Sequence, residues 1–270
     1  MPFAVIRGVQ YHYELAGSGP PLVLLHGFTG SAANWQVHAE ALASQYRVLT
    51  VDLLGHGQTD APEDPPRYAM SAAAADLAEL IDHVAEPPAH LLGYSMGARL
   101  ALYLAVQFPQ KCRSLIMESG SPGLTDEAAR RERIQQDDAL ADRIEQEGIE
   151  RFVDYWENIP LFTTQKRLGA TVRVDLRAQR LRNRPLGLAN SLRGMGTGAQ
   201  PSLWPILPQL HKPILLLAGA LDTKFVGIAR QMDNLLPDAR LVVVPDAGHT
   251  VHLEAPAAFQ THVLDFLSRH

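Results

Sequence analysis

The sequence contains a single cysteine among its 270 residues, Cys112. One cysteine cannot close a disulfide within the chain, and it has no neighbouring thiol with which to build a cysteine metal site. We therefore expect Cys112 to be a small, buried, apolar residue. His, Cys, Asp and Glu residues do not gather at a metal-ligand spacing elsewhere, so the sequence predicts no metal centre.

Positive charge and long apolar runs are also scarce. The 24 Lys and Arg residues are outnumbered by 29 Asp and Glu residues, which leaves a net charge of −5. This balance argues against non-specific binding to nucleic acid. The apolar runs are too short to span a membrane, and the N-terminus lacks a signal-peptide pattern. We expect a cytoplasmic protein with no membrane segment, either a monomer or a small homo-oligomer.

The clearest motif in the chain is the run Gly93-Tyr94-Ser95-Met96-Gly97. An apolar stretch precedes it and a helical pattern follows it, which is the context of the nucleophile elbow of α/β-hydrolases. Such an elbow is a tight turn between strand and helix, and it needs very small residues two positions before and after the serine. Ser95 would lie at a helix N-terminus, where unpaired backbone N–H groups favour negative charge.

Short apolar runs alternate with helical patterns through most of the chain, as a doubly wound α/β sheet requires. Because buried parallel strands read as continuous apolar runs, the fold class predicted is a mostly parallel central sheet with helices on both faces. The strands are expected at 22–25, 47–51, 89–92, 113–118, 213–218 and 240–244, after an opening hairpin at 3–15. Helices are expected at 34–43, at 71–81 with Ser71 as N-cap, and at 96–107, 225–236 and 256–267.

The alternation stops between residues 121 and 205, where charged helical segments replace the strands. We predict an α/β-hydrolase core made of residues 1–120 and 206–270, with residues 121–205 inserted as a helical cap. The expected cap helices cover 125–147, 149–158, 172–183 and 186–192.

Two further polar residues follow strands at the carboxyl edge of the predicted sheet, where open α/β sheets build their sites. Asp222 comes directly after the strand at 213–218, and His249 after the strand at 240–244. The order Ser95, Asp222, His249 is the order of the α/β-hydrolase triad. Asp246 and His252 are the nearest rivals, and we expect both to be structural.

The roles of these residues follow from their chemistry. A serine hydroxyl is a weak nucleophile and base near neutral pH, so His249 must take its proton. Asp222 would fix the imidazole tautomer and stabilise the imidazolium ion. The backbone N–H groups of Phe28 and Met96 are the candidates for an oxyanion hole.

The second half of the cap is rich in arginine. Between 163 and 205 eight Lys and Arg residues face one acidic residue, and Arg173, Arg177, Arg180 and Arg184 are spaced as one helical face. A solvated face is the plain interpretation for any single one of them. Together with Arg99 in the elbow helix and Arg133 in the first cap helix, they indicate a pocket for a substrate with several carboxylates, because guanidinium binds carboxylate bidentately.

Several motifs together resemble one family of this fold, the 2-succinyl-6-hydroxy-2,4-cyclohexadiene-1-carboxylate synthases, over nearly the whole chain. The motifs are Gly93 to Arg99, Glu118 to Leu124, Trp156 with Pro160-Leu161-Phe162, Arg180 to Asn183 with Gly187-Leu188-Ala189, Gly194 to Gly198, and Ala218 to Phe225.

The resemblance implies a lyase of menaquinone or phylloquinone biosynthesis that eliminates pyruvate and needs no cofactor. In this family the triad acts as a base, without an acyl-enzyme. The resemblance also implies a small polycarboxylate substrate. The substrate contacts that it implies are Tyr94, Arg99, Arg133, Trp156 and Arg180, with Arg177 and Arg182 as the neighbouring alternatives to Arg180.

Two other functions remain open at this stage. A carboxylesterase or a carbon–carbon bond hydrolase acting on an anionic substrate would share all three triad residues. A non-enzymatic binding protein on the same scaffold would usually lack one of them, whereas Ser95, Asp222 and His249 are all present.

Overall fold

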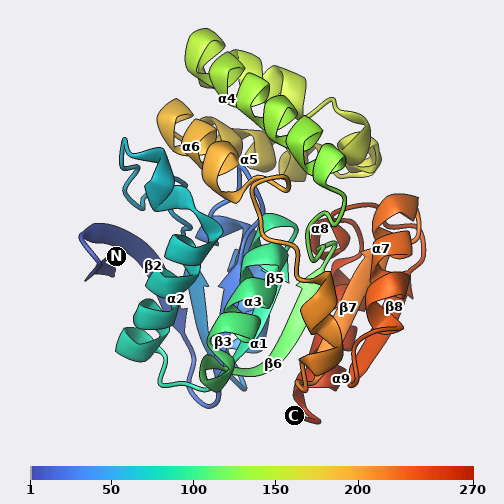
Figure 1. Ribbon diagram of the computed structural model, residues 1–270. Helices are drawn as coiled ribbons and strands as arrows, with labels where there is room; N and C mark the ends of the chain where they lie inside the picture. The colour runs from blue at the N-terminus through green and yellow to red at the C-terminus, as the bar shows by residue number, and fades with distance from the viewer. Residues whose placement is uncertain (1) are drawn as a thin grey trace.

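The computed structural model describes residues 2–270 and is built on an eight-stranded sheet (Figure 1). The strand order is β1-β2-β4-β3-β5-β6-β7-β8, and all strands from β4 to β8 run parallel to one another with β3 between β4 and β5. Strand β2 is antiparallel to both of its neighbours, β1 and β4. The α/β-hydrolase fold predicted from the sequence is confirmed. The strands are β1 (Phe3–Ile6), β2 (Val9–Ala16), β3 (Pro21–Leu25), β4 (Arg47–Val51), β5 (Ala89–Tyr94), β6 (Cys112–Glu118), β7 (Ile214–Gly219) and β8 (Ala239–Val244).

The central strands are buried on both faces, which explains their continuous apolar sequences. Along β3, Val23 and Leu25 face one layer of the core, whereas Leu22 and Leu24 face the other. All four side chains are fully buried. A strand that is covered on both sides gains nothing from polar alternation.

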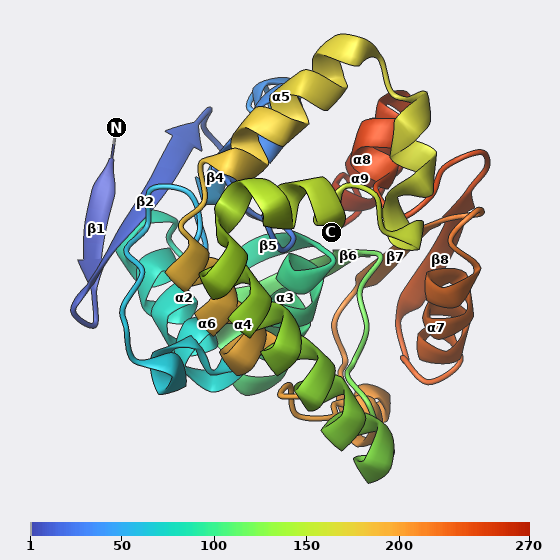
Figure 2. The same ribbon diagram turned by 90° about the horizontal axis from the view of Figure 1, so that it is seen from above.

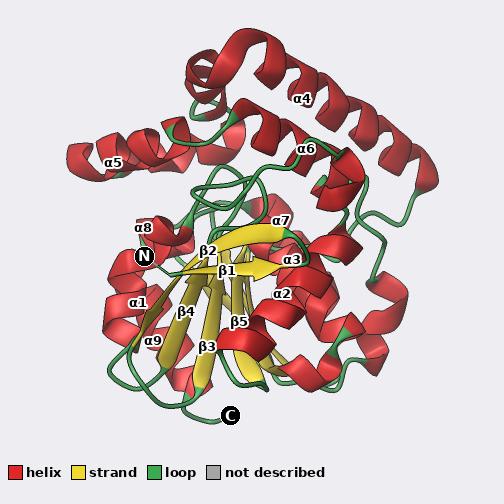
Figure 3. Ribbon diagram, turned by 90° about the vertical axis from the view of Figure 1, so that its left-hand side faces the viewer, coloured by secondary structure: helices red, strands yellow, loops and turns green. Residues whose placement is uncertain are grey.

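Helices cover the two faces of this sheet (Figure 3). Residues of α2, α3 and α7 pack on one face, and residues of α1 and α9 pack on the other. The helices of the core are α1 (Gln36–Leu42), α2 (Met70–Val84), α3 (Met96–Gln107), α7 (Thr223–Asp233), α8 (Val251–Glu254) and α9 (Pro256–Leu267).

Several helices begin one or two residues from the expected position, and α2 and α7 show the cause. Helix α2 begins at Met70, so Ser71 lies in its first turn and Ala69 is the N-cap. The chain enters this helix from a 3₁₀ turn at Pro65–Tyr68, and no side chain caps it. Helix α7 begins two residues before the expected 225 because the carboxylate of Asp222 accepts a hydrogen bond from the N–H of Phe225 and so caps the first turn.

The chain between β6 and β7 forms a helical layer above the carboxyl ends of the strands (Figures 1 and 2). It contains α4 (Glu127–Trp156), a 3₁₀ segment at Pro160–Arg167, α5 (Ala170–Leu181) and α6 (Pro185–Met195), and a further 3₁₀ segment at Trp204–Gln209 follows. Helix α4 is interrupted at Gly148, where φ is 81°. We keep the name cap for residues 121–205. The division of the chain at 120/121 and 205/206 stays a prediction, and the first residue of the expected core lies outside the described residues.

The helices that the structure describes, from residue 2 to the end of the chain, include none with the length and apolar character needed to cross a membrane. Cys112 is fully buried at the start of β6, and burial raises the pKa of its thiol to about 12.

Candidate active site

Ser95 lies at the sharp turn between β5 and α3. Its backbone has φ 52° and ψ −108°, a conformation that non-glycine residues rarely adopt. Two glycines allow this turn. A Cβ on Gly93 would lie 2.4 Å from the backbone of Gly97, and a Cβ on Gly97 would lie 2.2 Å from the carbonyl oxygen of Leu25. The motif therefore forms the tight strand-to-helix approach that its small residues indicated.

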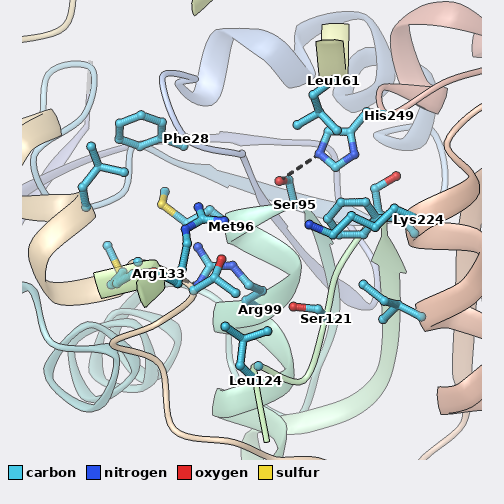
Figure 4. Close-up of a pocket in the computed structure, with 18 of the residues that line it drawn as sticks. Phe28, Ser95, Met96, Arg99, Ser121, Leu124, Arg133, Leu161, Lys224 and His249 are labelled. Atoms are coloured by element: carbon cyan, nitrogen blue, oxygen red, sulfur yellow. Dashed lines mark hydrogen bonds between the residues drawn. The ribbon is translucent and has the colours of Figure 1, made fainter. Parts of the chain in front are cut away.

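The structure brings Ser95, His249 and Asp222 together, and Figure 4 shows the contact between Ser95 and His249. The Oγ atom of Ser95 lies 3.1 Å from Nε2 of His249, and Nδ1 of His249 lies 2.7 Å from Oδ2 of Asp222. Both the imidazole and the carboxylate are buried. The geometry lets the imidazole exchange a proton with the serine while the carboxylate holds the ring in place.

The two rivals of these residues are placed elsewhere. Asp246 is exposed after β8. His252 is buried, but its Nδ1 lies 2.9 Å from the carboxylate of Glu118, at the end of β6. Neither residue lines the cavity that contains Ser95.

Phe28 and Met96 both line the cavity that contains Ser95 (Figure 4). Met96 is the first residue of α3, where a backbone N–H has no partner within the helix. Within residues 2–270 neither N–H group donates a hydrogen bond. The two groups are thus free to donate to an oxyanion.

The cavity has a volume of about 870 Å³ and lies between core and cap. Ser95, His249 and Tyr94 line it from the core, and Trp156 and Phe162 line it from the cap. Burial raises the pKa of Tyr94 well above its usual value, so its hydroxyl stays protonated and can act as a donor. The aromatic rings supply apolar area for a carbon skeleton.

Two arginines bring positive charge to this cavity. Arg99 donates through Nη1 to the carbonyl of Met195, at 2.7 Å, and to the side chain of Gln200, at 2.9 Å. Burial, with the charge of Arg133 as the second cause, lowers the pKa of Arg99 to about 10, which still leaves it charged at neutral pH. Arg133, on α4, forms an ion pair with the buried Asp137 one turn further along the same helix, with 2.9 Å between Nε and the carboxylate. Both guanidinium groups can bind carboxylates.

The cavity holds a third cation that the sequence reasoning did not assign, Lys224. It lies at the start of α7, two residues after Asp222, and lines the same cavity as Ser95 and His249, with Arg133 on the other side of the view in Figure 4. Its ammonium group forms no ion pair within the described residues 2–270. The available signal was its position in Asp222-Thr223-Lys224-Phe225, directly after a triad residue.

Comparison with known proteins agrees with this geometry. The family model described as alpha/beta hydrolase fold matches residues 20–256. A protein of Bacillus subtilis (strain 168), with the provisional name 2-succinyl-6-hydroxy-2,4-cyclohexadiene-1-carboxylate synthase, is 46% identical over 268 residues, which is 98% of this chain and 97% of the relative. The chain belongs to the 2-succinyl-6-hydroxy-2,4-cyclohexadiene-1-carboxylate synthase family.

Two further members of the synthase family are similar over most of their length. The synthase of Serratia proteamaculans (strain 568) is 35% identical, and the match covers 92% of this chain and 93% of that protein. The solved structure of MenH from S. aureus has a TM-score of 0.91 and 38% identity, and the match covers 96% of this chain and 98% of that one.

Of the contacts that the synthase family implies, Tyr94, Arg99, Arg133 and Trp156 line the cavity, and Arg180 does not. Arg180 lines two smaller pockets, which share Phe162 with the cavity that contains Ser95. Its guanidinium lies 5.2 Å from the centre of the Phe162 ring.

None of the four arginines expected on one face of the cap lines the cavity that contains Ser95, although Arg173, Arg177 and Arg180 line one smaller pocket together. Arg177 forms ion pairs with Asp154 and Glu157, and Arg184 lies beyond the end of α5, where it donates to the carbonyl of Thr59. Arg182 is exposed. The spacing alone could not show that α5 ends at Leu181 or that acidic residues of α4 pair with its arginines.

Metal ligands do not gather in the described part of the chain. Among residues 2–270, no three His, Cys, Asp or Glu side chains are placed as a metal-binding group.

Proposed function

We propose that the protein is a lyase that eliminates pyruvate from 2-succinyl-5-enolpyruvyl-6-hydroxy-3-cyclohexene-1-carboxylate and forms 2-succinyl-6-hydroxy-2,4-cyclohexadiene-1-carboxylate, as a step of menaquinone or phylloquinone biosynthesis. The observation that carries this proposal is the one cavity that Arg99, Arg133 and Lys224 line together with Ser95 and His249. A substrate with three carboxylates needs such cations. The synthase names of the relatives support the same reaction.

In the proposed mechanism the Ser95–His249 pair removes a ring proton next to the succinyl carbonyl. The proton passes to Nε2 of His249, and the electron pair of the broken C–H bond moves to the carbonyl oxygen as an enolate. Asp222 stabilises the imidazolium ion, with 2.7 Å between the two side chains.

The N–H groups of Phe28 and Met96 are placed to stabilise the enolate oxygen. One such donor typically contributes about 3 kcal/mol to the transition state. When the enolate re-forms its carbonyl, its electrons make a ring double bond between C2 and C3, the existing double bond shifts from C3–C4 to C4–C5, and the C–O bond from C5 to the enolpyruvyl group breaks. Enolpyruvate leaves, takes up a proton and becomes pyruvate. Serine therefore forms no covalent bond with the substrate in this mechanism.

The test supplies the purified protein with the enolpyruvyl cyclohexene substrate, made by the preceding pathway enzyme, and follows pyruvate through a coupled dehydrogenase. A small neutral aryl ester is the control substrate. Rapid pyruvate release with little ester cleavage would support the lyase. Intact-protein mass spectrometry during turnover checks the mechanism, because an accumulating adduct on Ser95 would contradict proton abstraction without acylation.

The second candidate is a carboxylesterase or carbon–carbon bond hydrolase for an anionic substrate. It is favoured by the distance of 3.1 Å between Ser95 and His249, which suits nucleophilic attack equally well. Brisk ester turnover without pyruvate release would favour the hydrolase. Ser95→Ala cannot separate the two candidates, since both would lose activity.

A further inference from the structure

The loop that carries His249 is covered by the 3₁₀ segment Pro160–Arg167 of the cap. A Cβ on Gly248 would lie 2.2 Å from Oγ1 of Thr164, so the side chain of Thr164 packs directly against the backbone of Gly248. The ring of Phe162 lies 6.1 Å from the imidazole of His249. The cap therefore contacts both the backbone just before His249 and the imidazole itself.

A chain of hydrogen bonds runs from the cap into the same loop. Nη2 of Arg180 donates to Oε1 of Gln165 at 3.0 Å, and Nε2 of Gln165 donates to Oγ1 of Thr250 at 2.9 Å. The hydroxyl of Thr250 then donates to Oε1 of Glu254 at 2.8 Å. In this series of hydrogen bonds each donor atom carries a hydrogen and each acceptor atom is an oxygen with a free lone pair.

The last member of the chain holds the backbone on both sides of His249. Oε2 of Glu254 accepts the N–H of Gly248 at 2.8 Å, and Oε1 accepts the N–H of Thr250 at 3.2 Å. A carboxylate that binds these two N–H groups limits how far the imidazole can shift from Ser95. Charge-assisted bonds of this kind are stronger than neutral ones.

We propose that Gln165 is a positioning residue for His249, because it connects the cap to this loop through Thr250 and Glu254. The inference rests on the proposed role of His249 as part of the base. Gln165 is buried at 6% exposure and uses both ends of its amide, one toward Arg180 and one toward Thr250. An amide is the only uncharged side chain of this length that can accept and donate in this way.

The test compares Gln165→Met, Gln165→Glu and Thr250→Val with the wild type. Met removes both bonds at similar size. Glu keeps the acceptor for Arg180 but cannot donate to Thr250 when ionised, so it isolates the part of the chain that leads to His249. Thr250→Val keeps the shape and removes the hydroxyl. The matched controls are Gln209→Met and Thr261→Val, both on the surface of the core.

Two measurements are made on each variant. The first is the kcat and KM of pyruvate release. The second is the NMR signal of the His249 Nδ1 proton in the substrate-free protein, together with the pH profile of kcat. We expect all three variants to lower kcat about tenfold or more while KM changes less than about twofold. The His249 signal and the apparent pKa of the profile should move in these variants and stay fixed in the controls.

An unchanged His249 signal and kcat in both Gln165→Glu and Thr250→Val would overturn the proposal. So would a higher KM at constant kcat, since Gln165 would then act on substrate binding through Arg180. If either Gln165→Glu or Thr250→Val fails to fold, the result from the other of these two variants decides. Failure of the proposed function would look different, because the wild type itself would release no pyruvate. The NMR signal and the aryl ester rate would still report the position of His249.

Discussion

The carboxylate of Glu118 accepts the backbone N–H of His252 at 3.1 Å and lies 2.9 Å from Nδ1 of the same residue. Both side chains are buried. The carbonyl of Glu118 also accepts the N–H of Ser95 at 2.8 Å. This pair therefore ties the end of β6 and the start of α8 to the turn that presents the serine.

Replacement of Glu118 by Ala should be strongly destabilising. It leaves His252 buried without its partner, and the loss of one member of a buried polar pair typically costs about 3–5 kcal/mol. Urea unfolding of the variant and the wild type measures the change in the free energy of unfolding. The control is Asp265→Ala, which breaks ion pairs on the surface and should change the midpoint little. Equal urea midpoints for the two variants would show that the buried Glu118–His252 pair contributes no more to stability than the surface ion pairs of Asp265.

Lys224 should contribute to binding of the anionic substrate. Lys224→Met removes a cation beside Ser95, and one charge-assisted hydrogen bond is worth about 1.5–3 kcal/mol, or roughly a 10- to 100-fold loss in kcat/KM. Lys224→Arg keeps the charge and should retain most of the activity. Steady-state pyruvate release gives both values.

The control for this charge is Lys212→Met, which removes a lysine that does not line the cavity. Hydrolysis of a neutral aryl ester should be unaffected by Lys224→Met, because that substrate has no carboxylate to bind. An equal loss on both substrates would mean that Lys224 acts through the triad rather than on the charge of the substrate.

Gly97→Ala should damage the elbow. The new Cβ would lie 2.2 Å from the carbonyl oxygen of Leu25, so β3 and α3 would have to separate. Such overpacking costs about 1–3 kcal/mol and would displace Ser95 from His249. The unfolding temperature and the rate of pyruvate release should therefore both fall.

Gly227→Ala is the matched control because it lies in α7 with open space around its Cβ position. Alanine in an open helical position stabilises by about 0.5–1 kcal/mol relative to glycine. A Gly97→Ala protein as stable and active as Gly227→Ala would contradict the close approach.

The core strands and the triad could be predicted because the sequence patterns that indicate them are short and contiguous. Each buried strand is a continuous apolar run, and Ser95, Asp222 and His249 each follow one of these runs, so their order and strand context were enough to bring them together. The cap was harder to predict. Whether Arg180 reaches the cavity depends on where α5 ends and on Gln165, and the partners of Arg177 lie on α4, about 20 residues earlier. These contacts depend on tertiary packing, which residue spacing does not contain.

The stability of the fold should decrease as the pH falls from 7 toward 5. Burial lowers the pKa of His26 to about 4, that of His56 to about 3 and that of His90 to about 4. Nε2 of His26 accepts the N–H of Leu53, so this ring is neutral in the fold. In the unfolded chain each histidine takes up a proton near pH 6.5. The unfolded state then binds more protons than the folded state between about pH 6.5 and 4, and stability is lost on acidification.

Each of these histidines contributes a slope of up to about 1.4 kcal/mol per pH unit below pH 6.5. Urea unfolding at pH 7.5, 6 and 5 (about one to two units apart) measures the sum, at pH values above the usual carboxylate pKa values of about 3.9 to 4.3. His90→Gln removes one titrating group while an amide can still bond to Ser114, which lies 2.7 Å from Nδ1 of His90. Its slope should be shallower than that of the wild type. A stability that is constant or rises between pH 7 and 5 would contradict the neutral state of the buried rings, since only a protonated imidazole in the fold would remove the difference in bound protons.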